Sequence, residues 1–207
     1  MRNIAVAVCI VVGLSLSATS PVAAIVVSLG RADIERALAL ARWPSTDEDR
    51  ARFHARYVVH APHSAAQPVY LDTVEVFTEF RRMELIAEQH ARLNDLFARG
   101  GAIREAEEAL EPWRGRVSIV AHVLVAPSVV RAPEVQAALI GPDTPRPIAT
   151  HRTPVIWSSS DGSSGLEGVD VESVFAPATI GQTVRMLEVW LRDTLLGRVV
   201  IDFRAVD

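Results

Sequence analysis

The sequence predicts an α+β fold, in which a helical N-terminal segment with one long amphipathic helix packs on a C-terminal antiparallel β-sandwich. Two observations support this prediction. In the N-terminal half, apolar side chains recur at three- and four-residue spacing, which is typical of helices. From Arg116 onward the apolar period is two residues, or the whole segment is apolar, and turn residues separate the segments. We expect about six strands in an immunoglobulin-like architecture, without a cysteine pair.

The first 24 residues have the pattern of a cleavable export signal. Arg2 supplies a short positive region, residues 4–16 are apolar, and the small residues 22–24 are a suitable cleavage site. The apolar run is too short for a good transmembrane helix. The alternative is a retained N-terminal membrane anchor, because residues 25–27 extend the apolar character. After the leader we expect a helical segment at 25–115 and a sandwich at 116–207, which together form one compact unit.

Three helices flank the predicted central one. Residues 30–42 form the first, which ends before Pro44. Ser45 or Thr46 then caps a short second helix, and the acidic residues 47–49 complement its positive N-terminus. A further helix spans residues 102–111 and is expected to lie antiparallel to the central helix.

The central helix is predicted over residues 72–97. Asp72 and Glu75 have the spacing of a capping box, and two glycines at 100–101 can end the helix. Phe80 and Met83 continue the apolar stripe at helical spacing. We therefore expect this segment to be the structural spine of the N-terminal part.

Six strands are predicted in the C-terminal half. Each is bounded by glycine, proline, serine or aspartate, which are common in turns. The predicted strands are residues 117–125, 134–140, 148–157, 169–175, 184–191 and 198–203.

The composition excludes several functional classes. The formal net charge is −4 and no basic face is evident, so nucleic acid is not an expected partner. The single cysteine, Cys9, lies in the leader, so a cleaved chain would have no disulfide, catalytic thiolate or cysteine-ligated metal. The chain has no lysine, which excludes a phosphate-binding P-loop and a lysine Schiff base.

Three histidines come nearest to a metal cluster. His54, His60 and His63 could converge with Glu79 or Glu84, but their spacing matches neither the helical H-x-x-x-H pattern nor the zinc-finger patterns. We therefore predict no metal site. His60 and His63 remain candidate binding residues, and exposed loop histidines are the simpler interpretation.

Two arginines and a tryptophan complete the candidate binding residues. Arg81 and Arg82 could form an anion-binding patch, because guanidinium groups suit carboxylate and phosphate. Trp157, beside the serine-rich loop 158–165, could be a platform for a ligand. That loop lies between two strands and lacks the strand-to-helix turn of a hydrolase nucleophile. No catalytic residue and no cofactor are predicted.

These patterns favour an exported, non-catalytic binding or assembly module in the periplasm or outside the cell. Its partner would be an unknown protein or small molecule. One alternative is a secreted hydrolase whose site assembles from dispersed His, Asp, Glu and Ser residues. Another is an interaction protein held at the membrane through an uncleaved N-terminal segment.

Overall fold

The computed structural model describes residues 28–42, 46–62, 67–93, 103–141 and 143–206. The predicted leader and His63 lie outside the described residues. Four of the five described α-helices occupy one side of the molecule and two antiparallel sheets the other, so the α+β sandwich class is confirmed. None of the described helices is long and apolar enough to cross a membrane.

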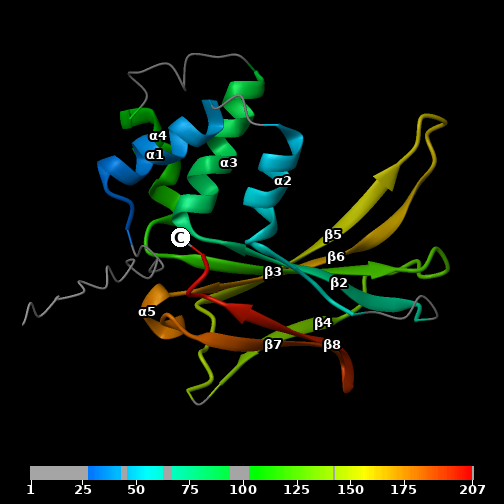
Figure 1. Cartoon of the computed structure of the whole chain (residues 1–207). Coiled ribbons are helices and arrows are strands. Elements are labelled where there is room, and N and C mark those ends of the chain that lie inside the picture. Colours follow the sequence, from blue (N-terminus) through cyan, green and yellow to red (C-terminus); the bar gives the residue numbers. More distant parts are fainter. Residues whose placement is uncertain (1–27, 43–45, 63–66, 94–102, 142, 207) are drawn as a thin grey trace, which may run out of the picture.

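Two sheets form the sandwich (Figure 1). The larger has the order β1 (Val58–His60), β2 (Val69–Phe77), β3 (Val117–Val125), β6 (Ser164–Phe175), β5 (Ala149–Ser158). The smaller has the order β4 (Val135–Ile140), β7 (Val184–Leu191), β8 (Thr194–Asp202). Six of the described strands follow Arg116, as predicted, and two precede it. The immunoglobulin-like arrangement stays a prediction.

The helices cover the outer face of the larger sheet (Figure 1). They are α1 (Arg31–Arg42), α2 (Asp47–Ala55), α3 (Glu79–Arg92) and α4 (Ile103–Leu110). A short helix, α5 (Pro177–Ile180), joins β6 to β7. Helix α1 packs along α3, and α4 contacts both of them. We call α1 to α4 the helical layer.

The predicted central helix is wrong in its first part. Its described portion begins at Glu79, after Thr78, whose side chain accepts a hydrogen bond from the Arg81 amide at 3.1 Å. Residues 72–77 belong to β2 instead, where Val74 and Val76 are buried and Glu75 between them is not. Strand β2 pairs with β1 on one side and β3 on the other. These long-range backbone bonds outweigh the local capping pattern. The segment 25–115 therefore also supplies two strands of the larger sheet.

Buried apolar side chains form two separate clusters. One fills the space between the sheets and includes Leu71, Ile119 and Leu187. The other lies within the helical layer and includes Ile34, Phe80, Met83, Ala87 and Leu110. Phe53 is half-buried and packs against both clusters. Polar side chains can therefore lie between the two clusters, where the helical layer meets the sheet.

Candidate functional site

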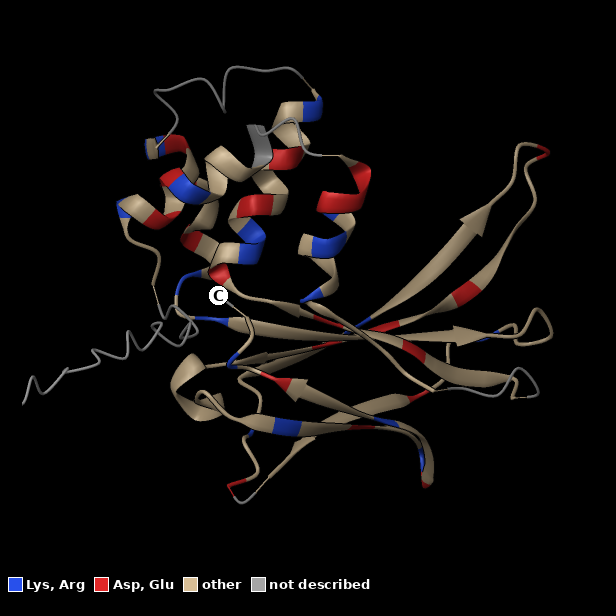
Figure 2. Cartoon of the chain, viewed as in Figure 1, with Lys and Arg blue, Asp and Glu red and all other residues tan. Residues whose placement is uncertain are grey.

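Charged and polar side chains lie where the helical layer meets the larger sheet, and we call this set the polar layer. Figure 2 shows both acidic and basic residues along α2 and α3 and on the strands below them. Successive side chains of a strand point to opposite faces of the sheet. In the larger sheet, the residues next to those that face the core between the sheets therefore face the helices. The members of the polar layer are His54, Glu75, Arg81, Arg82, Glu84, Glu88, Ser118, His122, Asp170 and Glu172.

Arg81 is at the centre of the polar layer and is only 4 % exposed. Its Nη2 atom donates to Glu75 Oε1 at 2.9 Å, and its Nη1 atom donates to Glu84 Oε2 at 3.2 Å. Nη1 also contacts Nδ1 of His54. The guanidinium carbon lies 5.0 Å from the centre of the Tyr57 ring. Arg81 therefore joins α3 to β2 and to α2, and its charge is held by internal carboxylates.

Arg82 binds the sheet at a different place. Its Nη2 atom donates to Ser118 Oγ at 2.7 Å and to Glu172 Oε1 at 3.1 Å. Its guanidinium carbon lies 3.7 Å from the centre of the Trp113 ring. Burial lowers the pKa of Arg82, and the Glu172 carboxylate opposes that shift. The two arginines predicted as an anion patch thus both contact carboxylates of the protein itself.

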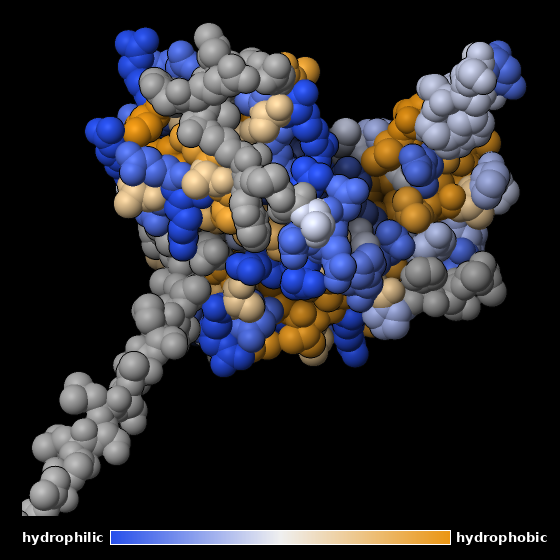
Figure 3. All heavy atoms as spheres, turned by 45° about the horizontal axis from the view of Figure 1, so that its top comes forward, coloured by the Kyte–Doolittle hydropathy of each residue, from blue (hydrophilic) through white to orange (hydrophobic). Residues whose placement is uncertain are grey.

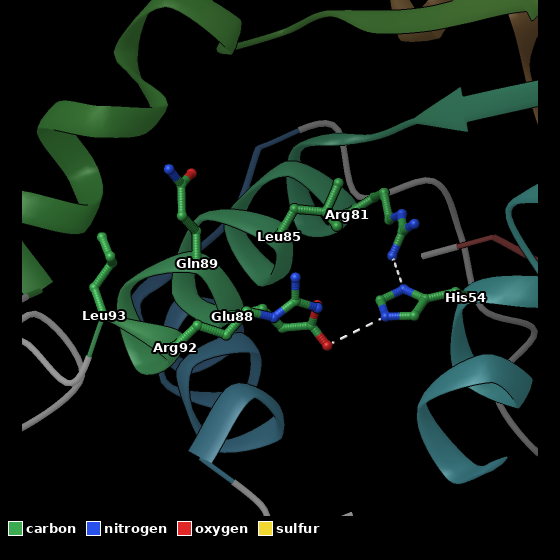
Figure 4. A pocket seen from close by; sticks show the side chains of 7 residues that line it. All are labelled: His54, Arg81, Leu85, Glu88, Gln89, Arg92 and Leu93. Carbon is green, nitrogen blue, oxygen red and sulfur yellow. Dashed lines mark hydrogen bonds and ion pairs between the residues drawn. The ribbon is translucent and has the colours of Figure 1, made fainter. Parts of the chain in front are cut away.

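A histidine, His54, and two glutamates, Glu84 and Glu88, meet between α2 and α3. Figure 4 shows His54 with Glu88 and Arg81. His54 Nε2 lies 3.2 Å from Glu88 Oε1. Because Arg81 donates to Nδ1, the proton of neutral His54 is on Nε2 and is donated to Glu88. Burial, and then the Arg81 charge, lower the pKa of His54, which favours this neutral form.

Glu84 and Glu88 are buried next to each other on successive turns of α3. The pKa of Glu84 is raised to about 7. Burial is the main cause, and the upward effect of the neighbouring Glu88 carboxylate is larger than the downward effect of the Arg81 charge. One ligand atom from each of Glu84, Glu88 and His54 can lie within 4.8 Å of the others. These donors are of the kind that bind divalent transition metals.

An open cavity of about 410 Å³ adjoins this group. Figure 4 shows its wall of α3 side chains facing His54 on α2. The residues that line it are His54, Arg81, Leu85, Glu88, Gln89, Arg92 and Leu93. The cavity therefore combines charged groups with the apolar side chains of two leucines.

A second histidine lies on the sheet. His122 Nδ1 is 2.8 Å from Asp170 Oδ1, and His122 Nε2 is 3.9 Å from Glu75 Oε2. The register of β3 and β6 sets this contact, because His122 and Asp170 are directly opposite each other. Glu75 contacts both His122 and Arg81, so the two histidines belong to one connected network.

The hairpin of β5 and β6 extends beyond the rest of the sheet. Strand β6 pairs with β3 only from Gly168 onward, whereas it pairs with β5 from Ser164. Residues 155–167, which we call the arm, therefore project from the body (Figure 1). The arm carries Ile156, 56 % exposed, and Trp157, 43 % exposed.

The structure separates the predicted binding residues. His60 is exposed at the end of β1, Arg81 and Arg82 are in the polar layer, and Trp157 is on the arm. His63 lies outside the described residues. His54 and Glu84 do meet, as considered from the sequence, but their partner is Glu88. The four-residue spacing of Glu84 and Glu88 places both on one helix face and could have indicated this pair.

Comparison with models of known protein families, with curated protein sequences and with solved structures gives no match.

Proposed function

We propose that this chain is an exported, non-catalytic binding module and that it contacts a protein partner through the arm. The observation that supports this most strongly is the exposure of Ile156 and Trp157 on an element that projects from the body. Tryptophan is enriched among the residues that dominate binding energy at protein interfaces.

The arm is built as an ordered element. Its tip is a turn in which Asp161 accepts hydrogen bonds from the Ser163 amide at 2.9 Å and from the hydroxyls of Ser159 and Ser163. These bonds lower the pKa of Asp161 to about 2. Gly162 has a φ of +84°, which favours glycine. An ordered arm loses little conformational entropy when a partner binds.

Trp157 is held in place by its cross-strand neighbour. It pairs with Gly165, and a Cβ atom at Gly165 would lie 2.7 Å from the indole nitrogen. The indole therefore rests on the bare backbone of β6. This packing fixes the ring while 43 % of the residue stays exposed. Such a rigid aromatic side chain is suited to anchor a partner.

The arm and the helical layer border a notch. Figure 3 shows the arm standing apart from the helices, with hydrophobic surface on the side of the notch that belongs to the sheet. The register places Thr153, Asp170 and His122 in one row across β5, β6 and β3. The side chain of Asp170 is 33 % exposed in this row. A partner segment with apolar and basic side chains would match this surface.

The contact would be made by side chains rather than by strand addition. Strand β5 is the edge of its sheet, and an unprotected edge can pair with another chain. Pro154 in the middle of β5 has no amide proton to donate. A proline at this position hinders continuous pairing along the free edge.

The test is selection from a random peptide library displayed on phage, with the full chain as bait. We expect the wild type to enrich peptides with apolar and basic residues, and the double variant I156S/W157S to lose them. The variant V200S is the matched control, because Val200 is 57 % exposed on the smaller sheet. Equal enrichment by all three proteins, or none by the wild type, would contradict the proposal.

One observation favours hydrolysis as a second candidate function. Asp170 orients His122 through Nδ1, which is the arrangement of a general base. The assay is release of nitrophenol from p-nitrophenyl acetate by the wild type and by H122Q. A wild-type rate above that of H122Q, at equal folded fraction, would support a hydrolase. Equal rates would support the binding module.

A further inference from the structure

We propose that His54, Glu84 and Glu88 form a binding site for one divalent transition-metal cation, with zinc as the best-suited ion. The ligands come from two helices, and their ligand atoms lie within 4.8 Å of one another. Ligand atoms around a tetrahedral zinc ion are about 3.4 Å apart, so small side-chain rotations close the site. One imidazole and two carboxylates are donors that zinc accepts, and zinc binds such sites more tightly than manganese does.

The local charge favours a cation. The buried guanidinium of Arg81 pairs with Glu75 and Glu84, and a third carboxylate, that of Glu88, contacts His54 beside it. Arg92 reaches Glu88 at 3.4 Å, but its side chain is 72 % exposed, so solvent weakens its effect.

The cavity provides room for the remaining ligands. It adjoins His54 and Glu88 and has a volume of about 410 Å³. A water molecule occupies about 30 Å³ in the liquid, so the cavity can hold the water that would complete a four-coordinate site. Because the cavity is open to solvent, a metal ion can reach His54 and Glu88 without unfolding of the helical layer.

Metal binding requires a change of tautomer at His54. In the described arrangement Nε2 carries the proton and donates it to Glu88. A metal ion on Nε2 needs its lone pair, so the proton moves to Nδ1. Arg81 Nη1 then turns away from Nδ1, while Nη2 keeps its ion pair with Glu75. The metal-free and metal-bound states are therefore distinguishable at the imidazole nitrogens.

The first test is calorimetric titration of zinc chloride into untagged, chelator-treated full-length protein. We expect one zinc ion per chain, with the affinity lowered at least about tenfold in H54Q and in E88Q. H60Q is the control, because His60 is exposed on β1 and outside the cluster. The same affinity in all four proteins, or no binding by the wild type, would overturn the proposal.

The second test needs no substitution and so does not depend on the folding of a variant. Nitrogen-15 spectra of the wild-type histidine rings are recorded with and without zinc. We expect the His54 resonances to change from the Nε2-protonated to the Nδ1-protonated form as zinc saturates. Unchanged His54 resonances at saturating zinc would exclude this histidine as a ligand. Magnesium should cause no change, because it prefers oxygen ligands.

Discussion

The Nη2 atom of Arg81 lies 2.9 Å from Oε1 of Glu75, and this ion pair joins α3 to β2. It crosses the space between the two hydrophobic clusters. Taking two charges out of water is costly, and their mutual attraction often only balances that cost. The ion pair between Arg81 and Glu75 therefore adds little net stability, but it fixes the position of α3 on β2. The polar layer, to which this ion pair belongs, also holds the two histidines of the candidate sites.

Removing the charge of Arg81 should destabilise the whole fold. Arg81→Met leaves the buried Glu84 and the half-buried Glu75 without their partner, and breaking one side of a buried pair costs about 3–5 kcal/mol. We expect urea unfolding to show a loss of that size. Arg92→Met is the control. The Arg92 side chain is 72 % exposed, so this substitution should lower the free energy of unfolding by less than about 1 kcal/mol. Equal losses in the two variants would contradict a structural role for the buried pair.

Glu84→Gln should stabilise the metal-free protein at alkaline pH. The pKa of Glu84 is raised from 4.5 to about 7 on folding, so the folded state keeps a proton that the unfolded state releases. Stability is therefore lost as pH rises from about 4.5 to 7. Glutamine removes this loss, so the variant should gain up to about 3 kcal/mol over the wild type at pH 8 and nothing at pH 4.

The measurement is urea unfolding in EDTA across this pH range, expressed as the difference between variant and wild type. Glu108→Gln is the control, because its side chain is 68 % exposed. A difference that does not grow with pH would show that Glu84 ionises normally in the folded protein.

Gly168→Ala should strongly destabilise the sheet. A Cβ atom at this position would lie 2.3 Å from the carbonyl oxygen of Val123 on the neighbouring strand. Backbone must shift to relieve that contact, which we expect to cost about 3 kcal/mol. Gly30→Ala is the control, since its nearest neighbour would be 3.6 Å away. Thermal unfolding of the two variants measures the difference, and similar midpoints would contradict the close approach of β6 to β3.

Export should remove the N-terminal leader. We expect mass spectrometry of the protein from its own cells to show a chain that begins at Ile25, after cleavage beyond Ala24. The membrane-anchored alternative predicts an intact N-terminus in the membrane fraction. A full-length chain in the soluble cytoplasmic fraction would contradict both.

The strand-rich half could be predicted because its signals are local. Strands β3 and β7 have the predicted bounds, 117–125 and 184–191, since each is a run of mainly apolar residues between turns. Strand β2 was missed because Asp72 and Glu75 have the spacing of a helix cap. The segment is a strand because it pairs with β1 and β3, and pairing between distant strands leaves no local sequence pattern.

The candidate sites depend on contacts that sequence spacing does not reveal. His54 and Glu88 are 34 positions apart and meet only because α2 packs beside α3. His122 and Asp170 are 48 positions apart and meet through strand register. Trp157 could be singled out from its place beside the serine loop. Its exposure follows from the projection of the arm, which depends on where β3 ends.

The central claim, that the arm is the contact surface for a protein partner, is tested most directly by photo-crosslinking in the cells that produce the protein. A benzophenone amino acid replaces Ile156 on the arm or, as the control, Val200 on the smaller sheet; both residues are more than half exposed. We predict one discrete light-dependent adduct from position 156, absent from position 200 and lost when W157S is added. No adduct from position 156, or the same adduct from both positions, would contradict the claim.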